Sequence, residues 1–315
     1  MSRSLIVLLI LAAVLLALPA IIYPVFLMKA MCFALFAAAF NLLLGYAGLL
    51  SFGHAAFFGM ASYVCAYTMK TYGLTPELGV LAGTAAAGLL GLVFGALAIR
   101  SRGIYFAMVT LALAQLVYFF CLQAPFTGGE DGIQAVPRGY FLGMIDLSRS
   151  DRLYYFVLAV CAMGFAAIYR LVHSPFGLAL QAIKDNEPRA VSLGYNTARY
   201  KLGAFVISAL LAGVAGSTKA LVFQLASLTD VNWHMSGEVV LMTLLGGLGT
   251  LVGPIVGAVL LTSIQNYLAQ TGAWVTIIQG VIFFLCVLCF RAGIVGSLRN
   301  WRARKSQATS SVPTQ

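Results

Sequence analysis

Long apolar segments recur along the whole chain and determine its predicted architecture. Most run for about 20 residues without a charge, the length that an α-helix needs to cross roughly 30 Å of hydrocarbon. The predicted spans lie near residues 5–27, 30–50, 54–69, 78–99, 103–123, 153–172, 202–222, 238–252, 254–270 and 275–291. The third, eighth and ninth are short, so we expect them to be tilted, broken or re-entrant. The pattern predicts an all-α, polytopic integral membrane protein with about ten (eight to ten) transmembrane helices, including short glycine-rich hairpins.

Composition excludes the soluble classes of protein. Of 315 residues, 61% are hydrophobic and 9% are charged, whereas a soluble domain carries about 25% charged residues. A larger core could not absorb this deficit, because a soluble protein must still cover its surface. Most of the chain is therefore expected to lie in a membrane.

The N-terminal segment looks like a signal peptide but is too long for one. Arg3 precedes an apolar stretch that begins at Leu5 and reaches Leu27, whereas the apolar region of a cleaved signal is usually about 7–15 residues. We therefore expect an uncleaved first span. Residues 1–291 are then one transmembrane domain, and residues 292–315 are a basic cytoplasmic tail that we expect to be disordered.

Basic residues predict the orientation of the chain in the membrane. Lysines and arginines gather in the connection at 100–102, in the loop at 170–201 and in the C-terminal tail, while the segments at 124–152 and 223–238 carry more acids than bases. Basic connections face the cytoplasm, so both termini are predicted to be cytoplasmic. Two termini on one side require an even number of spans, which favours ten over nine.

The net charge of +10 is explained by the membrane. A polybasic tail is attracted to anionic lipid and also sets topology, so no nucleic-acid partner is expected. Lys29 and Lys70 depart from the charge rule, because the predicted orientation places them on the outer side. Lys219 lies near the outer end of its span, and we expect it to extend its ammonium toward the interface.

The sequence offers no recognisable enzymatic site. The stretch GVAGSTK at 213–219 lacks the order G-x-x-x-x-G-K-[ST] of a phosphate loop and lies in a predicted span. The C-x-x-C pair at 286–289 is set in apolar residues that would suppress its thiolates, and the six cysteines suggest no disulfide framework. His54 has only His173 and His234 as histidine partners, without metal-ligand spacing. We expect no catalytic residue, metal or cofactor on this chain, so energy must come from a gradient or another subunit.

A first glycine-rich hairpin, NLLLGYAGLLSFGHAAFFGMASY, covers residues 41–63. Small residues let membrane helices approach closely, so helix packing alone is the competing explanation for its glycines. Polar groups at this depth are costly and tend to face an interior path. The residues that we expect to line or gate a translocation path are Asn41, Gly45, Gly48, Ser51 and His54.

Two further segments resemble parts of a transport path. The glycine cluster GGLGTLVGPIVGA at 246–258 echoes the first hairpin, since Leu-Gly at 44–45 and at 245–246 is followed by another glycine three residues later. Transporters often contain internal repeats. The segment TGGEDGIQAVP at 127–137 predicts a turn-rich outer loop, which is either structural or a gate. Its candidate gate residues are Thr127, Gly128, Gly129 and Asp131.

The basic connection SPFGLALQAIKDNEPRAVSLGYNTARYK, residues 174–201, is predicted to be structured. Apolar residues recur at helical spacing from Phe176 to Ile183 and predict an amphipathic helix. A second short helix is capped by residue 186 or 187 and ends near Gly194. Nothing nearby in the sequence covers the apolar face, so we expect a groove of a soluble partner to bury it; a solvated connector is the alternative. The residues expected to contact that partner are Phe176, Leu180, Ile183, Glu187, Arg189, Leu193 and Gly194.

Together these four segments resemble the LivM-type permease of the high-affinity branched-chain amino acid ABC importers. That family has a GYAGLLSxGHAAFFGxGAY-like hairpin, a TGGxDGLxxIP-like outer loop, an SPFGRAxxAIRENExAAxxLG-like cytoplasmic loop and a GGxGTLxGPxxGA-like hairpin. The resemblance covers about residues 30–270. Leu178 replaces the usual arginine, and Pro188 and Arg189 interrupt the usual run after Glu187, so the detailed coupling contacts are expected to differ.

The resemblance implies a permease subunit that forms the translocation path for branched-chain or related amino acids. It also implies a second homologous permease, two ABC ATPase subunits that use ATP and Mg, and a periplasmic substrate-binding protein. Residues 1–291 would be the permease domain, with 173–201 as the loop coupled to the ATPases, in the bacterial inner membrane. The chain itself would be no enzyme. The alternatives are permeases for urea, short amides, aromatic acids or sugars, and a gradient-driven secondary transporter or channel.

Overall fold

The computed structural model describes most of the chain between its two ends. The described residues are 18–20, 22–268, 277–278, 280–281, 284 and 293–297. The predicted spans at 5–27 and 275–291 and the basic tail at 292–315 therefore lie mostly outside the described residues. The redox-like C-x-x-C pair at 286–289 lies wholly outside them.

Helices make up nearly all of the described structure, which confirms the all-α prediction. They are α2 (Pro24–Asn41), α3 (His54–Tyr72), α4 (Pro76–Ala98), α5 (Ile104–Gln123), α6 (Ser150–Val172), α7 (Pro175–Asp185), α8 (Glu187–Ser192), α9 (Thr197–Phe223), α10 (Trp233–Gly246) and α11 (Gly253–Leu268). A π-helix, η2 (Leu42–Tyr46), continues α2 without a break. The short 3-10 turns are η1 (Leu18–Ala20), η3 (Pro125–Thr127), η4 (Gly129–Asp131) and η5 (Leu228–Asp230).

Five helices among the described residues are long and apolar enough to cross a membrane. They are α2 with η2, α4, α5, α6 and α9, and each coincides with a predicted span. The count of about ten spans is not confirmed. α10 has only 14 residues, too short to span roughly 30 Å without tilting or thinning the bilayer. α11 is described over 16 residues, up to Leu268. α3 has 19 residues but a more polar sequence than the five candidates.

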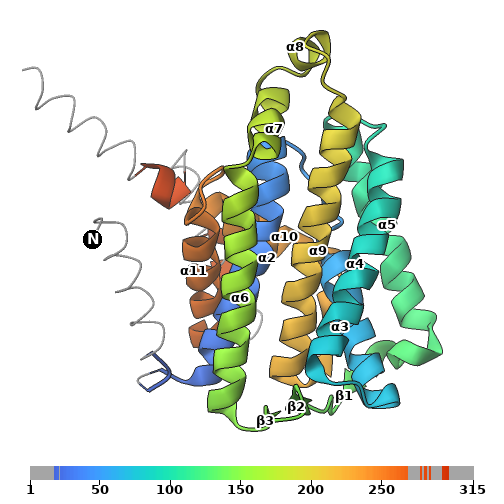
Figure 1. Cartoon of the computed structure of the whole chain (residues 1–315), viewed down its shortest axis with the longest axis vertical. Helices are drawn as coiled ribbons and strands as arrows, with labels where there is room; N and C mark the ends of the chain where they lie inside the picture. The colour runs from blue at the N-terminus through green and yellow to red at the C-terminus, as the bar shows by residue number, and fades with distance from the viewer. Residues whose placement is uncertain are drawn as a thin grey trace, which may run out of the picture.

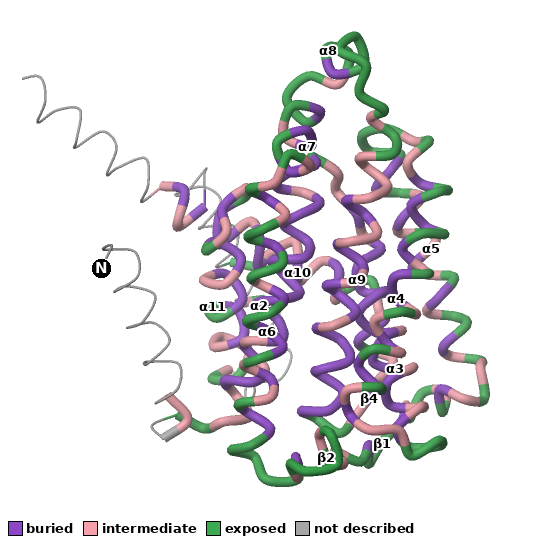
Figure 2. The backbone as a smooth tube through the Cα atoms, viewed as in Figure 1, coloured by how far each residue is buried: buried purple, intermediate pink, exposed green. Residues whose placement is uncertain are grey.

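α2 and α9 form the centre of the helical bundle (Figure 1). α9 packs against α3 and α4 on one side, and α2 packs against α6, α10 and α11 on the other. Most of α2 and α9 is buried, whereas α4, α5 and α6 are exposed over much of their length (Figure 2). Their exposed side chains include Leu89, Leu97 and Phe119, so this surface suits lipid or another membrane subunit.

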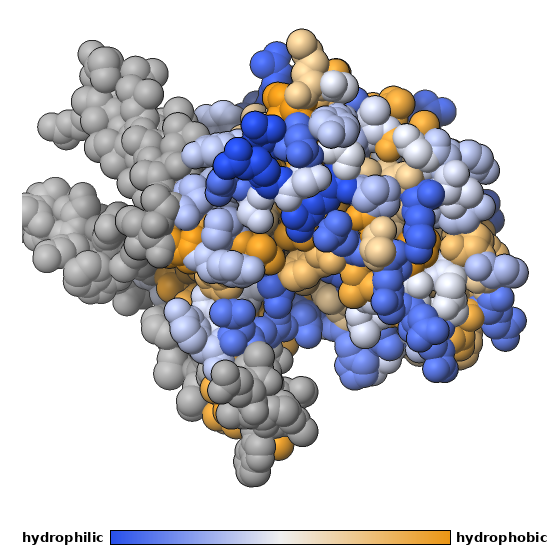
Figure 3. Space-filling model, turned by 90° about the horizontal axis from the view of Figure 1, so that it is seen from below, coloured by the Kyte–Doolittle hydropathy of each residue, from blue (hydrophilic) through white to orange (hydrophobic). Residues whose placement is uncertain are grey.

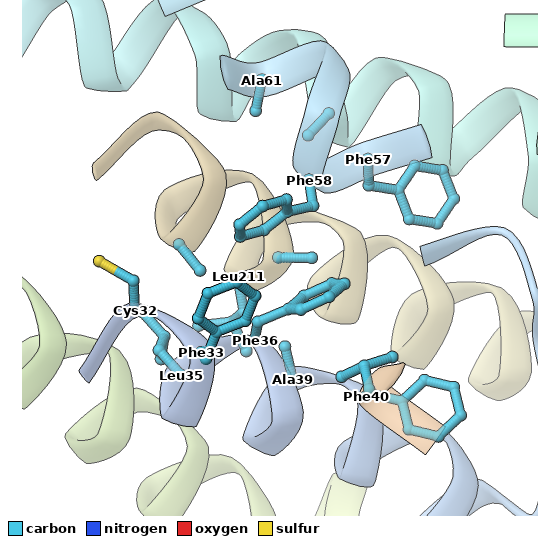
Figure 4. Packing of buried hydrophobic residues seen from close by; sticks show 14 of the residues in the cluster. Cys32, Phe33, Leu35, Phe36, Ala39, Phe40, Phe57, Phe58, Ala61 and Leu211 are labelled. Carbon is cyan, nitrogen blue, oxygen red and sulfur yellow. The ribbon is translucent and has the colours of Figure 1, made fainter. Parts of the chain in front are cut away.

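Aromatic rings fill the space between α2 and α3. Phe36 of α2 lies 4.5 Å from Phe58 of α3, centroid to centroid, and Leu211 of α9 closes the cluster (Figure 4). Small residues permit this packing, because a Cβ added at Gly216 of α9 would overlap the backbone of Phe58. The four buried cysteines of the described chain lie among these apolar residues as free thiols.

The two ends of the bundle differ in charge and structure. α7 and α8 project from one end, and the short strands lie at the other (Figure 1). β1 (Ile133–Gln134) pairs with β4 (Leu225–Ala226), and β2 (Tyr140–Phe141) pairs with β3 (Ile145–Asp146). Seen from the strand end, hydrophilic side chains alternate with apolar ones (Figure 3). The basic connections after α4 and α6 share the opposite end, where Arg102 lies close enough to Glu187 to interact electrostatically.

Candidate functional site

Asn41 joins the two glycine-rich segments by hydrogen bonds. It is the last residue of α2 and is buried. Its Nδ2 donates to the carbonyl of Thr250 over 2.8 Å, and its Oδ1 accepts from the backbone N–H of Gly249 over 3.0 Å. The turn between α10 and α11 is therefore held against the end of α2. The echo between the two sequence segments thus corresponds to a direct contact.

Gly45 makes this contact possible. A Cβ at this position would overlap Oδ1 of Asn41 and lie 2.8 Å from the backbone nitrogen of Gly249. Thr250 organises the facing turn, because its Oγ1 donates to the carbonyl of Gly247 and accepts from the N–H of Gly253. Because Gly45 has no side chain, η2 can lie close to the α10–α11 turn.

Lys184 is a contact of this cluster that the sequence did not single out. It lies in the last turn of α7, and its Nζ donates to the carbonyl of Gly45 over 2.6 Å. Gly48, also a predicted path residue, has a φ of +72° and faces the side chain of Lys184. Little in the sequence predicted this contact, because a lysine that follows Ile183 in a basic loop is expected to be an ordinary solvated charge.

His54 begins α3 inside an aromatic cage. Its ring makes edge contacts with Phe40 and Phe57, and its Nε2 lies 2.8 Å from Oγ of Ser208. The Ser208 hydroxyl donates to the carbonyl of Ala39. The hydroxyl of Ser208 has one proton, and the bond to Ala39 uses it. Oγ of Ser208 can therefore only accept in the His54–Ser208 bond, so Nε2 of His54 is the donor.

The predicted path residues of the first hairpin are packed into the chain itself. Asn41, Ser51 and His54 are buried, and Ser51 accepts a hydrogen bond from the N–H of Gly53. None of the three lines either of the two cavities that are described below. Their burial is explained by contacts within the chain, and a role in a translocation path stays a prediction.

The outer loop after α5 is a tightly bonded turn. The Thr127 hydroxyl is buried and bonds the carbonyls of Cys121 and Ala124. Gly128 and Gly129 have positive φ angles, while Asp131 is exposed. The loop continues into β1, whose pairing with β4 ties it to the end of α9. A gating role for the four predicted residues remains a prediction.

A cavity of about 230 Å³ lies beside this loop. Tyr67, Lys70 and Gly128 are among its lining residues, and Nζ of Lys70 donates to the carbonyl of Gln134. A second hollow, of about 270 Å³, lies between α3, α4 and α5 and has an entirely apolar lining that includes Phe94. Only the first offers polar groups to a ligand.

Arg138 anchors the outer loop, and sequence reasoning missed it. Its Nη2 donates to the carbonyl of Val222 over 2.9 Å, and its Nε donates to the carbonyl of Leu221 over 3.4 Å. These carbonyls belong to the last turn of α9, where helices favour a cation. Partial burial lowers the pKa of the Arg138 guanidinium.

Lys219 corrects the expectation that it extends to the interface. Its Nζ donates to Oδ2 of Asp230 over 2.6 Å, and the two side chains are 10% and 3% exposed. Asp230 lies in η5, which packs against α3, so the ammonium meets a buried carboxylate instead of water. Lys29 and Glu238 also lie close enough to interact with each other, so this end of the α2–α9–α10 interface contains several charges.

The prediction that a partner buries the apolar face of α7 is wrong for Leu180 and Ile183. Leu180 and Ile183 are buried in this chain, and α7 packs on α6, α9 and η2. The Phe176 ring stacks on Tyr200 of α9 at 5.5 Å. The amphipathic helix was predicted correctly, but the transmembrane helices cover its apolar face.

The exposed apolar residues of the loop lie elsewhere. They are Leu178, Val191, Leu193 and Tyr195, of which only Leu193 was predicted to contact a partner. Asn186 caps α8 by accepting from the N–H of Arg189, while Glu187 pairs with Lys201 over 2.6 Å. Arg189 and Gly194 are exposed. The loop therefore presents its tip rather than the inner face of α7.

A bundle of apolar helices with buried polar contacts, ending in a structured basic loop, defines a multi-pass membrane protein of the transporter class. The chain belongs to the family described as the permease component of the branched-chain amino acid transport system, whose profile matches residues 22–287. The family resemblance inferred from the four motifs is thereby confirmed. The relatives described next are transport permeases, which is consistent with a chain that is not an enzyme.

Relatives that are named for different substrates match this chain. It is 29% identical to the high-affinity branched-chain amino acid transport system permease protein LivM of Escherichia coli, over 88% of this chain and 72% of the relative. The LivM protein of Salmonella typhimurium is 28% identical over 88% of this chain and 70% of its own length. The ribose import permease protein RbsC of Bacillus subtilis is 27% identical over 57% and 58%. No solved structure matches the chain.

Proposed function

We propose that this chain is the membrane-spanning permease subunit of an ABC importer that carries branched-chain or chemically related amino acids. A periplasmic binding protein delivers the substrate, two ATPase subunits supply the energy, and a second homologous permease completes the path. The chain lies in a bacterial inner membrane with the α7–α8 end in the cytoplasm. The observation that carries the proposal is the similarity to LivM permeases over 88% of the chain.

The tip of the α7–α8 loop supports the proposed ATPase contact. Leu193 is 70% exposed and Val191 is 55% exposed, although water surrounds this end of the bundle in the proposed orientation. Arg189 lies between α7 and these apolar side chains and would add charge complementarity. A groove on a soluble subunit could bury this tip. The inner face of α7 meanwhile fixes the loop to the bundle, so a force on the tip would reach the transmembrane helices.

Similarity over length favours amino acids over sugars as substrates. The LivM proteins of Escherichia coli and Salmonella typhimurium match 88% of the chain, whereas the L-arabinose permease AraH of Azospirillum brasilense matches 72% and the ribose permease 57%. The sugar permeases still match more than half of the chain, and a sugar importer is therefore the second candidate function. A permease for urea, short amides or aromatic acids would share every feature described here.

The proposal is tested by reconstituting the complex encoded with this chain. We expect the cognate binding protein to bind leucine, isoleucine or valine, and proteoliposomes that contain both permeases and both ATPases to take up labelled leucine when ATP is enclosed. A variant of the ATPase that cannot hydrolyse ATP is the control. Uptake of ribose in place of leucine would transfer the chain to the second candidate. Uptake that needs a proton gradient and no ATP would reject an ABC importer.

A further inference from the structure

α7 is fixed to the transmembrane bundle at two kinds of contact. Leu180 and Ile183 are buried against neighbouring helices, and Lys184 follows directly with its ammonium 2.6 Å from the carbonyl of Gly45. Gly45 lies in the last turn of the α2–η2 helix, where carbonyls have no partner within the helix. The negative end of the helix dipole also favours a cation there. Lys184 therefore supplies a charge-assisted cap from a different helix.

The contact continues beyond Gly45 into another part of the fold. Gly45 lies against Asn41 and the backbone of Gly249. The Asn41 side chain bonds both Gly249 and Thr250. These residues form the turn between α10 and α11. A continuous series of hydrogen-bonded or touching groups thus links the loop helix α7 to the α10–α11 hairpin through the end of α2.

The backbone at the centre of this series departs from regular α-helical geometry. Residues 42–46 form a π-helix, a local widening that occurs mostly as single turns, often at functional sites. Gly48 follows with a positive φ of +72°, a conformation that glycine adopts without cost. The regular α-helical hydrogen-bonding pattern therefore ends where Asn41 and Lys184 make their contacts.

We propose that Lys184 is a positioning residue that couples α7 to the α10–α11 hairpin, through the carbonyl of Gly45 and the amide of Asn41. This proposal rests on the proposed function, because it needs an ATPase that moves α7. When the ATPases displace the loop, Lys184 moves the end of α2, and Asn41 carries the displacement to the turn at Gly249 and Thr250. Lys184 is not assigned to the ATPase contact or to substrate binding.

The test compares Lys184→Met with Lys184→Arg in the reconstituted complex. Methionine keeps an unbranched apolar stem of similar reach and removes the ammonium, while arginine retains a donor and a charge. Arg100→Met is the matched control, because Arg100 is an exposed cation at the same end of the bundle but outside the coupling loop. The measurements are co-purification of the ATPases, thermal stability in detergent, binding-protein-stimulated ATP hydrolysis, and leucine taken up per ATP hydrolysed.

We expect Lys184→Met to retain its ATPases and most of its thermal stability, while stimulated hydrolysis and leucine per ATP fall about tenfold, as loss of one charge-assisted hydrogen bond allows. Lys184→Arg restores at least half of the coupling, and Arg100→Met behaves as wild type. In a double-mutant cycle, Asn41→Ala added to Lys184→Met causes little further loss of coupling, since both break the same link.

Two results would overturn the proposed link. One is normal stimulated hydrolysis in Lys184→Met; the other is release of the ATPases, which would make Lys184 a docking residue. The proposed substrate is judged separately by the wild-type complex, whose failure to take up leucine would reject that substrate alone. Stimulation of hydrolysis by the cognate binding protein still decides the link in that case, because this measurement needs no knowledge of the substrate.

Discussion

At the scale of single residues, buried polar side chains in this chain form hydrogen bonds to segments that are distant in the sequence. Asn41 bonds residues more than 200 positions away, and His54 bonds Ser208 of α9. The sequence predicted that these polar residues lie deep in the membrane, since isolated polar groups stand out in apolar runs. It could not predict their partners, because a partner 154 or 209 residues away leaves no local pattern.

Replacing Asn41 by leucine tests how far it stabilises the fold. We expect Asn41→Leu to lower the free energy of unfolding by about 1–3 kcal/mol, because the N–H of Gly249 and the carbonyl of Thr250 lose their partner in a buried site. Thermal unfolding in detergent measures the change. Asn266→Leu is the control, since Asn266 is exposed on α11. A stable Asn41→Leu complex with normal uptake would exclude a role for Asn41 in the translocation path.

Glu187 gives the loop a dependence on pH. The Lys201 ammonium, 2.6 Å away, holds the pKa of the Glu187 carboxyl below its usual value of 4.5. The ion pair therefore contributes fully above pH 4.5 and is lost as pH falls through the lowered pKa. We expect proteolysis of the loop to accelerate only at pH below 4.5, and Lys201→Met to remove that dependence. Equal acid sensitivity in both proteins would assign the effect to other carboxylates.

At the scale of secondary-structure elements, periodicity predicted helices well and their neighbours poorly. The apolar spacing from Phe176 to Ile183 identified α7, but an apolar stripe does not specify which surface covers it. α9 is long enough for its first turn to reach the loop, so the chain covers its own stripe. The spans at 238–252 and 254–270 were predicted to be unusual because of their short length, and in the structure a glycine-rich turn separates α10 from α11.

Alanine substitutions at Leu180 and Leu193 should have different effects, because Leu180 is buried against the bundle and Leu193 is exposed at the tip of the loop. Leu180→Ala removes a fully buried side chain and is expected to destabilise the permease by about 2–5 kcal/mol. Leu193→Ala removes an exposed one, so the stability should hardly change while affinity for the ATPases falls about tenfold or more, the effect of losing one buried leucine at an interface. Thermal unfolding and ATPase co-purification report the two effects. The idea fails if Leu193→Ala retains its ATPases at wild-type affinity.

The buried ion pair between Lys219 of α9 and Asp230 of η5 is expected to stabilise the fold. Breaking a buried ion pair by removing one partner leaves an uncompensated charge, which costs about 3–5 kcal/mol. Lys219→Met and Asp230→Asn should therefore each destabilise the protein strongly, whereas the double variant should be nearer to wild type. Thermal unfolding of all four proteins measures the coupling. Additive losses in the double variant would show that the two residues act independently.

At the scale of the whole molecule, the sequence predicted the membrane class, the family and the order of motifs, while the count of about ten spans stays a prediction. Helices such as α3, α10 and α11 are apolar because they pack on other helices, not only because they face lipid. Hydropathy cannot distinguish these two environments. The two ends of the bundle were predicted more reliably, since charge is concentrated in connections that the helices bring to one end or the other.

We expect the strand end of the bundle to face the outside of the cell membrane and the α7–α8 end to face the cytoplasm. Met144 is 87% exposed in the strand end, and Val191 is exposed in α8 at the opposite end, so a cysteine at either position can react without disturbing the core. Because basic connections stay in the cytoplasm, we expect a membrane-impermeant maleimide to label Met144→Cys in intact spheroplasts. Val191→Cys should react only after the membrane is permeabilised. The unsubstituted protein, whose four described cysteines are buried, provides the background. Labelling of Val191→Cys from outside would place the α7–α8 loop in the periplasm, beyond the reach of any cytoplasmic ATPase, and would reject both the proposed coupling loop and the link through Lys184.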